Sequence, residues 1–173
     1  LQTAIHLLDE DGWETGHHIL RPAHLLMAEC AFLLGNVGDA YRLLEAIERN
    51  STNALDRAPG RNLRTGFLTN QGRLIEATEC SIETAGLLGL ELPSPHDTAA
   101  IRQATAEAFS AYQAALDGRS VESLADLPPL EGPTELAILD TISGVIPATF
   151  QWNPELHVLL VLKAVRLAAP HYT

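Results

Sequence analysis

The chain has 173 residues, of which 46% are hydrophobic but only 5% aromatic, and leucine and alanine dominate the apolar set. This bias favours helices, because strands prefer β-branched and aromatic residues. The net charge is −11, with only 11 basic residues. A nucleic-acid surface needs clustered lysine and arginine, so we expect no nucleic-acid partner.

Membrane and secretory features are lacking in the same way. No apolar run reaches the ~18 residues that a bilayer span needs, and no signal peptide is recognisable at the N-terminus. Cys30 and Cys80 are predicted inside helices as buried free thiols. Two distant cysteines make no disulfide framework, so we predict a cytoplasmic protein with no membrane partner.

The first third of the chain is predicted to form three helices. Residues 1–9 have the pattern of a short helix, and a longer helix is expected from 13 to 34. Proline lacks a backbone donor and clashes with the preceding turn, so Pro22 should bend or restart this helix. A third helix is predicted at 37–49, directly after a tight turn.

The turn at 34–36 joins the last two of these helices into a hairpin. Gly35 suits a left-handed C-cap, and Asn36, together with Asp39, is expected to cap the next helix. The apolar stripes of the two helices are Met27, Ala28, Ala31 and Leu34 before the turn, and Val37, Ala40, Leu44 and Ile47 after it. Small alanines at the crossing allow close approach, as in a tetratricopeptide hairpin.

A second hairpin is predicted further along the chain. Residues 51–60 hold Ala-Pro-Gly, so its first helix is broken or starts late, near Arg61, and a turn at 70–72 leads to a helix at 73–88. Shifting the first hairpin by 37 residues lays Gly35 on Gly72, Val37 on Leu74 and Ala40 on Ala77. Ser81 and Thr84 replace Leu44 and Ile47, which indicates a degenerate repeat.

The remaining residues are also predicted to be helical. Ser94 and Pro95 are expected to start a helix whose face is Ile101, Ala104, Ala108, Ala111 and Ala115, closed by Asp117-Gly118-Arg119. A short helical turn is predicted at 121–125, and a further helix from Pro133 to 146, interrupted by Pro147.

The last predicted helix starts at Asn153-Pro154-Glu155. It is apolar on nearly every side, which predicts burial on every side and a further element beyond it. Because the chain also starts at Leu1 inside a helical pattern, we expect a piece of a larger protein.

Catalytic and metal-binding patterns are not recognisable in the sequence. His17, His18 and His24 do not share one helical face, and Asp9-Glu10-Asp11 is explained by helix capping. The sequence has no phosphate-binding loop before Lys163 and no nucleophile elbow. We therefore predict a non-catalytic segment without cofactor, metal or catalytic residues.

Taken together, these motifs resemble the tetratricopeptide-like (TPR-like) region of multidomain bacterial and fungal signalling proteins. Those proteins combine a protein-kinase-like domain and an AAA/STAND-type ATPase with GAF and sensor histidine kinase domains. The resemblance rests on the order of LLDEDGW at 7–13, LLGNVGDAYRLLEAI at 33–47, QGRLIEATECSIETAGLLGLELP at 71–93, SVESLADLPPL at 120–130 and PELHVLLVLKAVRLA at 154–168.

The resemblance implies an all-α superhelix of helical hairpins. Residues 1–93 would hold two degenerate repeats, and residues 94–173 further hairpins of the same array, truncated at the C-terminal end. The expected function is a scaffold that couples an ATPase to signalling domains, through contacts with other domains of the parent chain or with a protein or peptide. The alternatives are a free-standing peptide-binding adaptor and a small-molecule sensor with a ligand near Trp13, His17 and Trp152.

Overall fold

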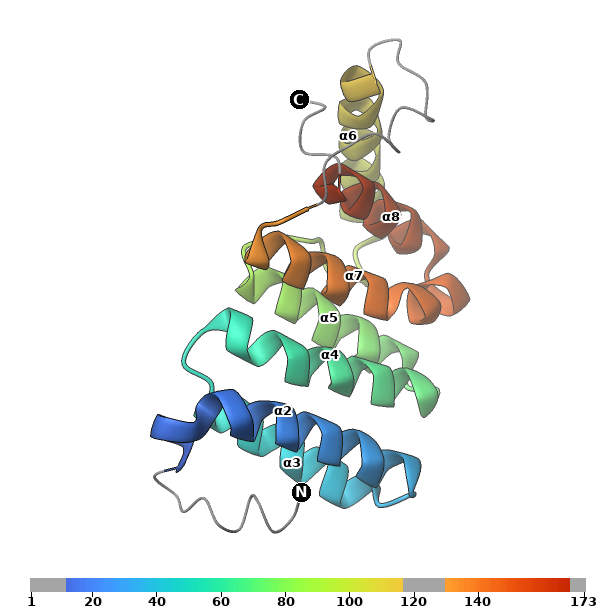
Figure 1. Ribbon diagram of the computed structural model, residues 1–173. Coiled ribbons are helices and arrows are strands. Elements are labelled where there is room, and N and C mark those ends of the chain that lie inside the picture. Colours follow the sequence, from blue (N-terminus) through green and yellow to red (C-terminus); the bar gives the residue numbers. More distant parts are fainter. Residues whose placement is uncertain (1–11, 117–129, 169–173) are drawn as a thin grey trace.

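The computed structural model describes residues 12–116 and 130–168, and every regular element within them is a helix. The helices are α2 (Gly12–Leu33), α3 (Val37–Asn50), α4 (Ala54–Asn70), α5 (Leu74–Leu87), α6 (Thr98–Leu116), α7 (Pro133–Trp152) and α8 (Pro154–Ala168) (Figure 1). The all-α prediction is therefore confirmed for this part of the chain. The helix expected at 1–9, the segment 117–119 and the turn at 121–125 lie outside the described residues.

The helices pair as hairpins that stack along one direction (Figure 1). α2 packs against α3, α4 against α5, and α7 against α8. α4 also contacts both helices of the α2–α3 hairpin, and α7 contacts both helices of the α4–α5 hairpin. α6 packs against α8, so it lies at the far end of the stack although it precedes α7 in sequence.

The turns of the first two hairpins have the same backbone geometry. Gly35 and Gly72 adopt φ angles of +81° and +73°, which side chains disfavour. In the first turn Asn36 N–H donates to the Ala31 carbonyl, and in the second Arg73 N–H donates to the Leu68 carbonyl. These bonds close the Schellman motif, and the second set lies 37 residues after the first.

The start of α4 differs from the prediction. α4 begins at Ala54, not near Arg61, because the Asn53 side chain accepts a hydrogen bond of 2.9 Å from the Asp56 backbone N–H and caps the helix. Pro59 lies inside α4, and Pro147 likewise lies inside α7 instead of interrupting it. Both helices continue because their flanking turns are buried in the stack.

Three further local predictions are wrong. The kink in α2 lies at Gly16 (φ −111°, ψ 15°), not at Pro22. Asn36 makes no side-chain cap bond, and its backbone carbonyl accepts from α3 instead. α6 is capped not by Ser94 but by Asp97, whose carboxylate accepts from the Ala100 N–H at 3.0 Å.

Burial also corrects two predictions. Cys30 is exposed and Cys80 half-buried, so neither thiol is fully buried. The buried residues of α8 are Leu156, Leu159 and Leu160. In the same helix Val158 and Val161 are 49% and 39% exposed. α8 is therefore buried on one side only. Within the described ranges, no helix combines the length and hydrophobicity that crossing a membrane would need.

Candidate functional site

The predicted repeat positions are packing positions of the hairpins. Ala28, Ala40 and Ala77 are fully buried and Leu44 is 4% exposed, whereas Leu74 is half-buried. Close contact of α2 with α3 and of α4 with α5 follows from these small side chains. The residues hold the stack together and expose no reactive group.

The second hairpin keeps its inward positions buried but makes them polar. Ser81 and Thr84 are 3% and 1% exposed, as buried as the leucine and isoleucine at the matching places in α3. The Ser81 hydroxyl donates to the Thr141 carbonyl of α7 at 3.1 Å, and Arg61 Nε donates to the Thr84 hydroxyl at 2.9 Å. Hydrogen bonds to α7 and α4 therefore replace apolar packing here.

A charged groove runs between α4 and α5 on the side that faces α3. It has a volume of about 290 Å³ and is lined by Arg61, Arg64, Leu68, Glu76, Glu79, Cys80 and Glu83. The α4 residues recur at intervals of three and four, and so do the three glutamates of α5. Each set therefore lies along one helical face, and the two faces meet across the groove. We call it the α3–α5 groove because it opens on the side of the stack where α3 and α5 lie, although its lining side chains come from α4 and α5.

Arg61 joins three helices at one end of the α3–α5 groove. Its guanidinium bonds Glu83 of α5 at 2.6 Å and approaches Glu48 of α3 at 3.4 Å. The Arg61 side chain is 19% exposed, whereas both glutamates are exposed, so only the guanidinium is shielded from water. Arg61 is thus committed to holding α3, α4 and α5 together.

Tyr41 of α3 lies against Arg64, the next lining residue along α4. The Arg64 guanidinium carbon lies 5.5 Å from the centre of the Tyr41 ring, a cation–π arrangement. The Tyr41 hydroxyl donates to Gln71 at 3.2 Å. Burial raises the pKa of the Tyr41 phenol, and the nearby positive charges of Arg73 and Arg64 partly oppose this.

The glutamates of the groove differ in their partners. Glu76 pairs with Arg73, and this hydrogen bond lowers the pKa of the Glu76 carboxyl. Glu79 contacts His96 Nε2 at 3.0 Å, a partner that is charged only when protonated. Glu79 is therefore the lining carboxylate with the weakest ionic partner among the described residues.

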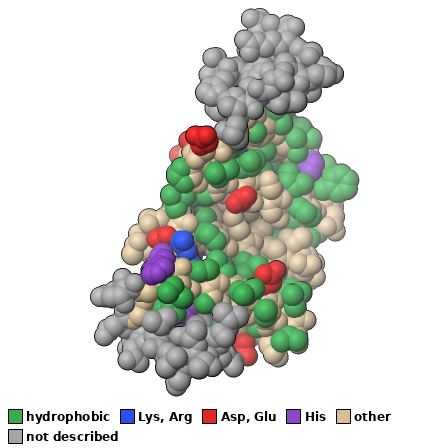
Figure 2. Space-filling model, viewed as in Figure 1, with side chains coloured by type: hydrophobic (Ala, Val, Ile, Leu, Met, Phe, Trp, Pro, Cys, Tyr) green, Lys and Arg blue, Asp and Glu red, His purple; other side chains and the backbone are tan. Residues whose placement is uncertain are grey.

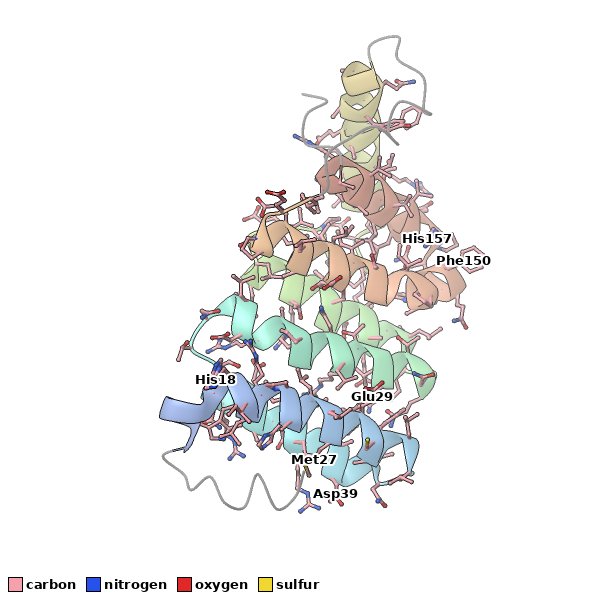
Figure 3. The ribbon with its side chains drawn as sticks, viewed as in Figure 1. His18, Met27, Glu29, Asp39, Phe150 and His157 are labelled. Carbon is pink, nitrogen blue, oxygen red and sulfur yellow. The ribbon has the colours of Figure 1, made fainter. Side chains whose placement is uncertain are left out.

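An apolar cleft of about 520 Å³ lies between α6 and α8. It is lined by Arg102, Thr105, Ala106, Phe109, Glu155, Val158 and Leu162. The Arg102–Glu155 ion pair, with a shortest distance of 2.7 Å, links the two helices beside this cleft. Phe150, 68% exposed, stands at the same end of the stack with its ring 5.5 Å from that of His157 (Figure 3).

The face formed by α2, α4 and α7 has few charged side chains and many apolar ones (Figure 2). On α2, Ile19, Leu26 and Leu33 follow each other at seven-residue spacing and are 52%, 48% and 77% exposed. Seven residues are about two helical turns, so these side chains form one stripe. The charges of the groove and this apolar stripe therefore give the stack two chemically different surfaces.

The three residues of the sensor alternative do not come together. Trp13 lies with His17 and His24 in α2, with ring centres 6.2 Å and 4.8 Å away. Trp152, at the end of α7, donates to the Thr78 hydroxyl at 2.9 Å. His17 approaches Asp56 of α4 at 3.8 Å, an inter-hairpin contact.

The same holds for clusters of metal-ligating side chains. Among the described residues, no three histidine, cysteine, aspartate or glutamate side chains are placed to hold an ion together. His18 is exposed and lies at the N-terminal end of α2 (Figure 3).

The α3–α5 groove was not predicted from sequence, although its signal was present. Two successive helices carry stripes of opposite charge: Arg61 and Arg64 at i, i+3 on α4, and Glu76, Glu79 and Glu83 at i, i+3, i+7 on α5.

Comparisons with protein-family models, curated proteins and solved structures find no match to this chain.

Proposed function

We propose that this chain is a non-catalytic, TPR-like helical scaffold that couples parts of a larger signalling ATPase or sensor kinase through protein contacts. The observation that carries the proposal is the stacking of the hairpins. The first helix of each following hairpin, α4 and then α7, packs against both helices of the hairpin before it. This is the arrangement by which helical-repeat proteins build extended binding surfaces.

Repetition of the turn supports the same interpretation. The glycines at 35 and 72 and the backbone bonds around them recur at the interval predicted for a repeat, a tetratricopeptide unit plus about three residues. Because each hairpin contacts only its neighbours, a small rotation at one interface adds to those at the others. Such a stack can transmit a change of angle from one end to the other.

Cross-linking mass spectrometry on the complete gene product tests the coupling role. The proposal predicts cross-links between surface residues of this stack and segments encoded outside these 173 residues. Those cross-links should change when ATP is added, if an ATPase lies upstream. An open reading frame limited to these residues, or a longer product without such cross-links, would contradict the coupling role.

A free-standing peptide-binding adaptor is the second candidate, favoured by the α3–α5 groove. Its wall and floor carry charged side chains of both signs, which suits a polar peptide better than an apolar metabolite. The adaptor requires that the isolated chain bind a peptide without the rest of any parent protein. Peptide binding by the purified chain, together with an open reading frame limited to these residues, would favour the adaptor over the coupling role.

A further inference from the structure

Two residues that line the α3–α5 groove lack a permanent partner of opposite charge. Arg64 makes no ion pair with any described residue, while Arg61 beside it is held by two glutamates. Glu79 has only His96, at 3.0 Å. The groove therefore offers one available cation and one weakly paired anion, on facing helices.

The side chains around Arg64 and Glu79 favour the binding of a charged group. Leu68 and Cys80 line the groove with them, so part of its wall is apolar. The Tyr41 ring lies under the Arg64 guanidinium and restricts its motion. A carboxylate that reached Arg64 would make a charge-assisted hydrogen bond with a guanidinium that is already held in place.

We propose that the α3–α5 groove binds a polypeptide segment carrying one acidic and one basic side chain close together, with its carboxylate on Arg64 and its basic group on Glu79. The inference rests on the proposed scaffold function, because it names the chemistry of the partner. A wholly acidic segment would meet the three glutamates of α5, and a wholly basic one would meet both arginines of α4. A segment of mixed charge avoids both repulsions.

The size of the groove points to a segment and not to a folded domain. A volume of about 290 Å³ lies at the lower end of the range for small-molecule pockets, so only a few side chains fit inside. The segment would therefore insert a short pair of charged residues while its backbone stays at the rim. Affinity of the isolated peptide is expected to be weak, because exposed ion pairs contribute little to binding.

Peptide titrations of the purified 173-residue chain, followed by amide chemical shifts, test the proposal. The probes are three blocked alanine-based peptides of equal length. One carries a glutamate and a lysine four residues apart, one carries two glutamates, and one carries two lysines. We expect the mixed peptide to bind most tightly and to shift amides of α4 and α5 around the groove.

Substitutions assign each charge to its partner. Arg64→Gln and Glu79→Gln should each weaken the mixed peptide about two- to fivefold, the range of an exposed ion pair. Replacing the peptide's glutamate by glutamine should weaken binding to the wild type but not to Arg64→Gln, because the partner is already gone. Matched controls are Glu29→Gln on α2, labelled in Figure 3, and Arg166→Gln on α8, both exposed and outside the groove.

Each other outcome overturns the proposal. Tighter binding of the all-lysine or all-glutamate peptide, equal binding by Arg64→Gln and wild type, or shifts confined to other helices would refute the assignment, as would no binding at millimolar peptide. The scaffold function fails separately, through the cross-links described above. Cross-links outside the chain with no peptide in this groove would leave the scaffold and remove only this site.

Discussion

Gly60 controls how closely the second hairpin approaches the first. A Cβ placed on Gly60 would lie 3.2 Å from Ile47 Cγ2 and 3.7 Å from Ile47 Cβ. Ile47 is 1% exposed, so its side chain has little room to move away. We predict that Gly60→Leu forces α4 away from α3, because a larger side chain has to enter filled space.

The expected cost follows from that geometry. Overpacking a filled core costs about 1–3 kcal/mol. For a chain of this size, 1 kcal/mol corresponds to about 2–4 °C in melting temperature, so Gly60→Leu should lower it by about 2–12 °C. The matched control is Gly66→Leu in the same helix, whose Cβ would meet no heavy atom within 4 Å. There the better helix propensity should give a gain of about 0.5–1 kcal/mol.

Thermal and urea denaturation followed by circular dichroism measure both variants. A double-mutant cycle then tests the contact: Ile47→Ala alone costs about 2–5 kcal/mol through a cavity, but combined with Gly60→Leu the loss should be smaller than the sum. The expected coupling is about 0.5–3 kcal/mol. Equal effects of the two leucine substitutions, or strictly additive losses in the cycle, would refute the close approach of α3 and α4 at Gly60.

Three further predictions concern caps, buried polar groups and ionisation. Asn53→Ala should cost about 0.5–2 kcal/mol through loss of the α4 cap, whereas Asn36→Ala should cost much less in the same urea titration, because the Asn36 side chain makes no cap bond. Ser81→Leu should destabilise by about 1–3 kcal/mol, since a leucine has to enter the space beside the Thr141 carbonyl; a stabilised variant would contradict the polar α5–α7 contact. The pKa of the Tyr41 phenol is raised in the folded chain, so the neutral phenol stabilises the fold at pH values below 10.0, the ordinary pKa of tyrosine. This stabilisation is lost as the pH rises through the pKa of the folded chain. Tyr41→Phe should therefore reduce the alkaline loss of stability in pH-dependent melting curves.

The hairpin turns could be predicted from sequence because their signals are local. A glycine at the end of an apolar stripe is enough to predict a left-handed C-cap, and both Gly35 and Gly72 adopt this conformation. The Asn-Pro-Glu start of α8 is equally local: Asn153 accepts from the Leu156 N–H at 3.1 Å. Such signals need no knowledge of what packs against the helix.

The interruptions predicted at Pro59 and Pro147 are wrong because the effect of a proline on a helix depends on distant packing. A proline inside a helix costs about 3 kcal/mol locally. In α4, however, Ala58 and Gly60 on either side of Pro59 are buried against neighbouring helices. In α7, Val145 and Ala148 are buried around Pro147 in the same way. Burial of the flanking turns offsets the lost hydrogen bond, and no local pattern reports it.

The polar positions of α5 show the same dependence more sharply. In the sequence, serine and threonine in the apolar stripe of α5 indicate a degenerate repeat. In the structure Ser81 is buried and bonded to a carbonyl that lies 60 residues away in the chain. A buried hydroxyl without a partner would cost about 1–3 kcal/mol, so the serine is tolerated only because α7 supplies an acceptor there. The repeat position therefore stays buried, while the helix that packs against it determines whether an apolar or a polar residue is tolerated there.

The charged groove has a related origin, since its two stripes are ordinary surface patterns until the hairpins stack. Arginines at 61 and 64 would be solvated on an isolated α4, and the glutamates of α5 likewise. Stacking of α3 on α4 brings Tyr41 beneath Arg64 and Glu48 against Arg61, which leaves one cation paired and the other available. The asymmetry between two arginines only three residues apart therefore comes from the inter-hairpin contact together with Glu83 of α5, which bonds Arg61 at 2.6 Å. A substitution that opens this contact, such as Gly60→Leu, should consequently alter the groove as well as the stability of the stack.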